Sequence, residues 1–282
     1  MSPLISVLER RVIPQLAKSH GVQPTETAEV LWATSRAADP SPLVAADQTG
    51  SRFIKPLSEA LLGNDLQAAI QIVAQHAGER TDGSFIDSCQ DLLTPTAQLL
   101  GQLWEEDEAD FHAVTLATGL LQTLLRSLPG SKYSWSTGPG DRSLHDQPRI
   151  LLINAPNEQH GLGLSMLGRA FSQAGWIVEG GPSIPPATYL SRISEQNFDV
   201  AGVSIACSQW IEPCKQQIAA LRQHSLNTDV KIIIGGQLAI HHPELERWTG
   251  ADGSALDLHG ALALARALIG ERASSEAAAE LA

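Results

Sequence analysis

Cysteine is scarce in this sequence, and its scarcity excludes several classes of protein. Only three cysteines, Cys89, Cys207 and Cys214, occur among 282 residues. Three scattered thiols cannot form the disulfide framework of a small secreted domain or the four-ligand set of a structural zinc site. A redox switch at Cys207 and Cys214 is an alternative, but we interpret both residues as small buried hydrophobes.

Positive charge and long apolar runs are also lacking. The chain has 19 Lys and Arg against 31 Asp and Glu, a net charge of −12, and no basic cluster. A nucleic-acid-binding protein needs a basic surface to neutralise phosphates, so specific DNA binding by this chain is not expected. No apolar run reaches the roughly 18 residues of a membrane span, and charges interrupt the first residues, where a signal peptide is apolar. We therefore expect a cytoplasmic protein without membrane contact.

The patterns that are present indicate an α/β protein built in parts. Residues 1–52 predict a helical N-terminal extension, and residues 53–129 a helical bundle, because apolar residues recur at helical spacing between short connections. Residues 130–147 are rich in Gly, Ser and Pro and predict a linker. Residues 148–270 alternate strand and helix signals, and residues 271–282 predict a flexible tail.

The strand signals predict a sheet that is covered on both faces. Apolar runs begin at Arg149, Trp176, Val200 and Val230, and a short fifth run lies near Gly253–Ala255. These runs are nearly continuous rather than alternating, which is typical of parallel strands buried on both sides. Helical patterns separate consecutive runs. We therefore predict a doubly wound, five-stranded parallel sheet of the Rossmann-like type after the bundle.

Three polar loops follow predicted strands: Asn157–Gly163, Ser204–Ser208 and Gly235-Gly236. Open α/β sheets bind ligands at the carboxyl ends of their strands, so we expect these loops to line one crevice. His160 places an imidazole at this edge, and the neighbouring glycines let the backbone approach a bulky ligand.

The first loop reads E-x-H-x-x-G through Glu158, His160 and Gly163, and it resembles the D-x-H-x-x-G signature of cobalamin-binding domains. The resemblance implies that His160 binds the cobalt from below, in place of the cofactor's own base. It also implies that Glu158 tunes the imidazole through a hydrogen bond. Glu158 is one methylene longer than the usual Asp.

The same family has a serine and a glycine pair after later strands, and their order is kept here. Ser204 matches the serine, Gly235 and Gly236 match the pair, and Ala206 stands where the family has leucine. The resemblance implies that these residues line a slot for the nucleotide tail, which Ala206 widens. A side chain at either glycine is expected to fill space that this slot needs.

The helical half carries a further part of the resemblance. Cobalamin-binding modules cover the upper corrin face with a tryptophan, and Trp104 within residues 102–117 matches it. An indole is a large, flat, apolar lid. Light-sensing relatives carry a Glu-His pair ten and eleven residues later, where this chain has Val114 and Thr115. His112 lies out of register and is the nearest candidate for an upper ligand.

Over residues from about 55 to 270, the chain resembles the AerR/PpaA family of cobalamin-binding antirepressors, which is related to the sensor domain of AppA. The resemblance implies a light- or redox-responsive transcriptional regulator, not an enzyme, that binds a photosystem-gene repressor of the CrtJ/PpsR type. It leaves open whether the cofactor is hydroxo-, methyl- or adenosylcobalamin, and whether the protein forms homo-oligomers.

Two alternatives use the same loop. A haem-binding sensor would place His160 on iron, because imidazole serves either metal. A corrinoid carrier protein of a methyltransferase shares the bundle and the sheet but needs a partner enzyme. The adjacent pair His241 and His242 is a poor chelating site, because neighbouring side chains project in different directions.

Overall fold

In the computed structural model, residues 48–79, 85–127 and 147–280 are described. All described residues belong to one compact unit, Ala46–Ala282. Most of the predicted N-terminal extension and of the predicted linker therefore lie outside the described residues. None of the described helices combines the length and apolarity that crossing a membrane requires.

The first described part is helical, as predicted. Its elements are α4 (Gln48–Leu62), α5 (Leu66–Glu79), α6 (Phe85–Ser88), a π-helical stretch (Cys89–Leu93), α7 (Thr94–Glu105) and α8 (Phe111–Ser127). Their apolar faces meet in one core that includes the fully buried Leu57, Leu92 and Leu121. Pro95 lies in the first turn of α7, directly after the π-helical stretch; Leu93 and Thr94 keep right-handed helical dihedral angles, so the apolar run that begins at Phe85 changes helix type there.

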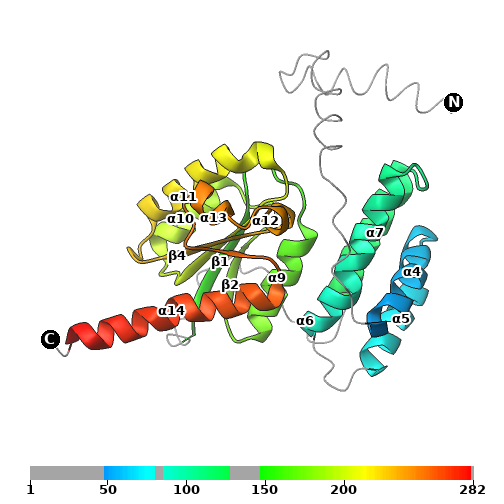
Figure 1. The fold of residues 1–282 in the computed structure, drawn as a ribbon, viewed down its shortest axis with the longest axis horizontal. Coiled ribbons are helices and arrows are strands. Elements are labelled where there is room, and N and C mark those ends of the chain that lie inside the picture. The colour runs from blue at the N-terminus through cyan, green and yellow to red at the C-terminus, as the bar shows by residue number, and fades with distance from the viewer. Residues whose placement is uncertain (1–47, 80–84, 128–146, 281–282) are drawn as a thin grey trace, which may run out of the picture. The chain divides into compact units, whose positions relative to one another are not determined.

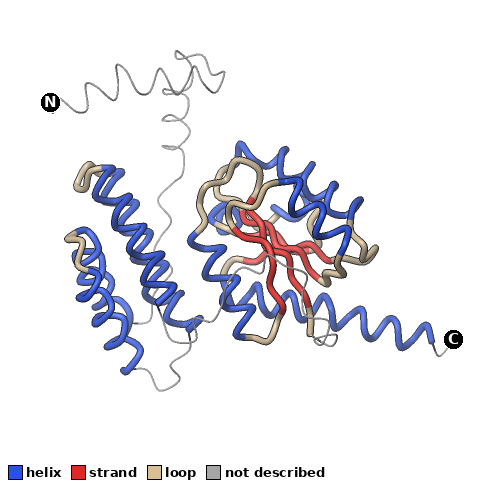
Figure 2. The backbone as a smooth tube through the Cα atoms, turned by 180° about the vertical axis from the view of Figure 1, so that it is seen from behind, coloured by secondary structure: helices blue, strands red, loops and turns tan. Residues whose placement is uncertain are grey.

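The second described part is the predicted doubly wound sheet (Figures 1 and 2). Its strands are β1 (Arg149–Asn154), β2 (Ile177–Gly181), β3 (Val200–Ser204), β4 (Lys231–Gly235) and β5 (Gly253–Ala255). All neighbouring strands are parallel, in the order β2-β1-β3-β4-β5. The helical elements that connect or follow them are α9 (Leu162–Gln173), α10 (Pro186–Glu195), a short 3-10 turn (Ser208–Trp210), α11 (Ile211–His224), α12 (Gln237–His241), α13 (Leu245–Thr249) and α14 (Leu258–Glu280).

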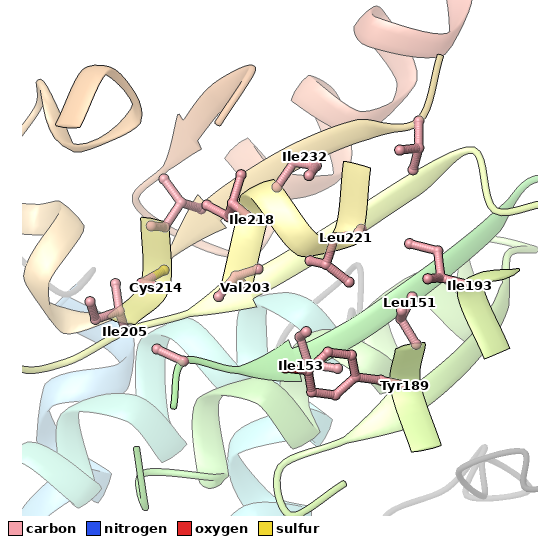
Figure 3. Packing of buried hydrophobic residues seen from close by; sticks show 14 of the residues in the cluster. Leu151, Ile153, Tyr189, Ile193, Val203, Ile205, Cys214, Ile218, Leu221 and Ile232 are labelled. Carbon is pink, nitrogen blue, oxygen red and sulfur yellow. The ribbon is translucent and has the colours of Figure 1, made fainter. Parts of the chain in front are cut away.

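Alternate side chains of β1, β3 and β4 enter two different cores, one on each face of the sheet. Leu151 and Ile153 of β1 pack with Ile218 of α11 in the first core, which Figure 3 shows. Ile150 of β1 packs with Phe171 of α9 in the second core, to which α14 also contributes. Burial on both faces explains why the interiors of β1, β3 and β4 are continuously apolar. Helix α14 runs to Glu280, ten residues past the predicted end of the domain.

Helix α9 also contacts the helical part. Met166 of α9 is buried in the same cluster as the bundle leucines. The Arg169 guanidinium donates a hydrogen bond to the main-chain oxygen of Leu125, in the last turn of α8, and lies 4.3 Å from the Phe85 ring centroid. A guanidinium suits this position because the carbonyls at a helix C-terminus carry partial negative charge. The helix that follows the His160 loop is therefore packed against the bundle.

Candidate cofactor site at the carboxyl edge of the sheet

The strand order reverses between β1 and β3, and this point defines the candidate site. Helix α9 leaves β1 for one face of the sheet, and α11 follows β3 on the other. Asn154, Ser204 and Gly235, which end β1, β3 and β4, are partners in register across adjacent strands. The three predicted loops therefore start side by side at the position where doubly wound sheets bind ligands.

A tight turn directs the chain from β1 into the His160 loop. The main-chain nitrogen of Glu158 donates to the oxygen of Ala155 at 3.1 Å, which closes a four-residue turn. Pro156 is its second residue, and Asn157 is its third, with φ of +65°. Proline followed by a residue with positive φ is the pattern of a type II turn, and asparagine tolerates this conformation. The Pro156-Asn157 dipeptide is a sequence signal for this turn that our sequence analysis missed.

The Glu158 carboxylate is buried and joins two loops. Its side chain is 2% exposed. Oε1 accepts hydrogen bonds from the main-chain nitrogens of Gln159 and His160, at 2.9 and 3.0 Å. Oε2 accepts a hydrogen bond from the main-chain nitrogen of Ala206 at 2.8 Å. Glu158 therefore fixes both its own loop and the loop that follows β3.

The His160 ring is held by Glu158 on one side and open on the other. Nδ1 lies 2.5 Å from Oε1 of Glu158, whereas the side chain as a whole is 75% exposed. A carboxylate only accepts, so Nδ1 carries a proton, and in the neutral ring the lone pair is on Nε2. Among the described residues, no hydrogen bond involves Nε2. This is the arrangement of a metal-ligating histidine whose second nitrogen donates to a carboxylate.

The contact also shifts the pKa values of the two side chains in opposite directions. Burial alone would raise the pKa of Glu158, but the hydrogen bonds from the His160 ring and from the amides of His160 and Ala206 outweigh it and lower the pKa to about 2. The hydrogen bond to Glu158 raises the pKa of His160, against a smaller opposite effect of burial. Glu158 is thus a permanent anion that strengthens the imidazole as a donor.

The single imidazole of His160 suits a metal whose other ligands are supplied by a macrocycle. Nowhere in the described ranges do three His, Cys, Asp or Glu side chains gather as they would around a bare metal ion. A corrin supplies four nitrogen ligands itself and needs one imidazole from the protein. Gly163 is exposed in the first turn of α9, and a Cβ there would meet nothing within 4 Å. The described residues around His160 therefore fit cobalamin.

Gly235 and Gly236 lie where predicted, at and after the end of β4, and the packing around them gives a further reason for glycine. Gly236 has φ of +101°, and a Cβ there would lie 2.5 Å from the oxygen of Ile205 and 3.0 Å from Oγ of Ser204. A Cβ on Gly235 would lie 3.0 Å from the oxygen of Ala255. The chain's own main chain lies beside both positions, so the fold itself favours glycine at Gly235 and more strongly at Gly236; their role in a slot for the nucleotide tail stays a prediction. Ser204 is half-buried beside them.

The predicted upper-face residues lie in the helical part. Trp104 is half-buried in the last turn of α7, and His112 is exposed in the first turn of α8. Their roles toward the cofactor stay predictions. A groove of about 440 Å³, lined by residues of α6, α9 and α14 such as Ile86, Ala170 and Leu262, contains none of the predicted site residues.

The class of the sheet domain follows from comparison with known families. Residues 148–263 match the model of the B12 binding domain. This range contains Glu158, His160, Ser204 and the glycine pair. The sheet part is a Rossmann-like cobalamin-binding domain preceded by a helical region, and its cofactor is cobalamin, the first of the two cofactors predicted from the sequence.

Individual proteins that are similar to this chain include corrinoid proteins. The chain is 26% identical over 114 residues to the dimethylamine corrinoid protein of Methanosarcina barkeri, covering 39% of this chain and 51% of that protein. It thus spans about half the length of this curated relative. The monomethylamine corrinoid protein of Methanosarcina barkeri has a similar fold, with a TM-score of 0.58 at 13% identity over 76% of this chain and 97% of that chain. A cobalamin-binding protein from Desulfitobacterium hafniense gives a TM-score of 0.40 at 18% identity, over 76% and 98% of the two chains.

Proposed function

We propose that this protein carries cobalamin with His160 as the lower cobalt ligand and presents the cofactor to a protein partner. The observation that carries the proposal is the Glu158–His160 pair. A buried carboxylate fixes Nδ1 at 2.5 Å, while the ring remains 75% exposed. A fixed but accessible imidazole suits a large metal complex that must approach from solvent. When bound, cobalamin would supply a cobalt centre that can carry a methyl group or respond to light.

The chain supplies no general acid or base at this pair, which supports a carrier rather than a complete enzyme. Glu158 accepts four hydrogen bonds, and its pKa is lowered to about 2. With a pKa this far below neutral, Glu158 has no proton to donate at neutral pH and is a weak general base. The role of Glu158 is structural, because it fixes the imidazole of His160 and the loop after β3. In the carrier role, chemistry on a substrate is left to residues of a partner.

The favoured partner is a methyltransferase. The curated relative is named as a corrinoid protein, and it aligns with 114 residues of this chain. In this role, the loops after β1 and β3 hold the cofactor from below, and its upper face is left to the partner. Homo-oligomerisation is not required.

A light- or redox-responsive antirepressor is the second candidate. It is supported by the loop sequence around Glu158 and His160 and by the α7–α8 segment around Trp104, on which the resemblance to the AerR/PpaA family rests. The net charge of −12 makes a repressor protein of the CrtJ/PpsR type a better partner than DNA.

The first experiment tests the cofactor. The purified protein is incubated with hydroxocobalamin and, separately, with hemin, and is then passed through a desalting column before its absorption spectrum is recorded. We expect retention of cobalamin with a spectrum that changes in His160→Ala. Retention of hemin alone, or an unchanged cobalamin spectrum in the variant, would contradict the proposal.

The second experiment separates the two partner classes. Methylcobalamin-loaded protein is mixed with a purified methylcobalamin:thiol methyltransferase, and demethylation is followed by absorbance. In parallel, a CrtJ/PpsR-type repressor on photosystem promoter DNA is titrated with loaded protein in light and in darkness. Demethylation without any change in repressor occupancy supports the carrier. Light-dependent release of the repressor, without demethylation, supports the antirepressor and overturns the carrier.

A further inference from the structure

The side chain of Asn154 lies underneath the His160 loop and contacts it. Asn154 is the last residue of β1 and is 8% exposed. Its Nδ2 donates to the main-chain oxygens of Glu158 at 3.2 Å and Pro182 at 3.1 Å, and reaches the oxygen of His160 at 3.5 Å. Pro182 follows β2, so one amide connects the loops after two neighbouring strands.

The orientation of this amide is set by its neighbours. All three atoms around Nδ2 are carbonyl oxygens, which only accept hydrogen bonds. The flipped amide would place a carbonyl oxygen against the three carbonyls. Within the described residues, Oδ1 of Asn154 is buried without a partner. An unsatisfied buried oxygen costs stability, so Asn154 is explained by what its donor group does for the loop.

A second buried side chain, that of Gln217, holds the main chain of Asn154. Gln217 of α11 is 6% exposed, and its Nε2 donates to the main-chain oxygen of Asn154 at 3.0 Å. Asn154 is thus fixed by its pairing with Ser204 in the sheet. It is also fixed by Gln217 of α11, which packs on the face of the sheet away from α9. Such a fixed residue is a rigid support for the main chain of the His160 loop.

We propose that Asn154 is the positioning residue of the His160 loop. The His160 ring is mostly exposed, so packing does not place it. Its position depends on Glu158 and on the main chain of residues 158–160, two of whose carbonyls Asn154 holds. Removing the donor releases this main chain and lets the imidazole leave the geometry that Glu158 sets. The inference deepens the proposed function, since it assumes His160 as the ligand, but its first test needs no cofactor.

The apoprotein test compares two buried asparagines by hydrogen exchange. Asn154→Leu keeps the volume and removes the donor. The matched control is Asn227→Leu. Asn227 is 6% exposed, its Nδ2 donates to the oxygen of Phe198 at 2.8 Å, and it precedes β4 at the opposite edge of the sheet. We expect the amides of residues 158–160 to exchange about tenfold faster in the Asn154 variant, which corresponds to the net free energy of one hydrogen bond. Their exchange rates should not change in the control.

The holoprotein test measures cobalt coordination by spectroscopy, because a general loss of stability does not change this coordination in the molecules that remain folded and loaded. At equal cobalamin loading, the fraction of cobalt bound by histidine, read from the absorption and electron paramagnetic resonance spectra, should fall in Asn154→Leu and not in Asn227→Leu. If Asn154→Leu does not fold, Asn154→Asp replaces it. This change has the same size and sets an oxygen against the three carbonyls.

The outcomes separate this inference from the proposed function. Failure of the wild-type protein to bind cobalamin would overturn the proposed function, whereas the exchange result would still report on Asn154. Wild-type exchange of residues 158–160 in the Asn154 variants, or equal effects of the Asn154 and Asn227 changes, would overturn the positioning role.

Discussion

Glu158 accepts a hydrogen bond from the main-chain amide of Ala206 at 2.8 Å, although 48 residues separate them in sequence. This contact crosses the point where the strand order reverses, because Glu158 follows β1 and Ala206 follows β3. The same carboxylate binds Nδ1 of His160. One buried side chain therefore sets the imidazole and the neighbouring loop together, and a change at either loop reaches the other through it.

Replacing Glu158 by Gln should change how stability depends on pH. The lowered pKa of Glu158 contributes stability that is complete above its ordinary value of 4.5 and is lost as pH falls toward about 2. The raised pKa of His160 contributes stability that is complete below its ordinary value of 6.5 and is lost as pH rises through the raised value. The pair therefore stabilises the apoprotein most between pH 4.5 and 6.5.

Urea denaturation of wild type and Glu158→Gln across this range measures the effect. We expect the difference in free energy of unfolding to be largest inside the window and to shrink on both sides. Glu158→Asp, which keeps the charge, serves as the control for loss of the carboxylate. A difference that stays constant with pH would show that the pair is not coupled as described.

Two glycines should respond to substitution in opposite ways. Gly163→Val adds a side chain where nothing lies within 4 Å, so thermal stability should hold while cobalamin affinity falls on the order of tenfold, or about 1.4 kcal/mol. Gly236→Ala should instead lower the stability of the apoprotein by about 1–3 kcal/mol, because φ is positive and Ile205 is in the way.

Calorimetry of the apoproteins and cobalamin titrations measure the two effects separately. Gly78→Val is the control for Gly163, since Gly78 in α5 is equally open. A Gly163 variant with full affinity would show that the cofactor does not bind against this turn. A Gly236 variant of normal stability would show that the fold does not require glycine at this position.

The sequence predicted the parts of this protein that repeat a local pattern. The strands were predictable because burial on both faces makes them continuously apolar, and the helices because of their periodicity. Glu158 and His160 were predictable because the residues that form the pair are two positions apart. The support of the pair was not predictable, since the amide of Ala206 is main chain and Asn154 acts on carbonyls that any residue would supply. The role of Gly236 depends on φ and on Ile205, which only the folded chain brings close.

Cys207 should be the thiol that reacts first in the native protein. Cys89 and Cys214 are buried, and burial raises the pKa of both thiols, that of Cys214 to about 12. Cys207 is half-buried, and burial and the Glu158 charge raise its pKa as well, so it should react more slowly than a free thiol. Titration with a disulfide reagent, with and without denaturant, measures this. Fast modification that persists in Cys207→Ser would assign the reactive thiol elsewhere.

The identity of the lower cobalt ligand tests the account most directly. Protein labelled with ¹⁵N-histidine is loaded with unlabelled cobalamin, reduced to the cobalt(II) state, and measured by electron paramagnetic resonance. Coordination by His160 predicts that each cobalt line is split into a doublet by ¹⁵N, and that the doublet is lost in His160→Ala. Triplet splitting in the labelled wild type, from the cofactor's own ¹⁴N base, would contradict His160 as the ligand.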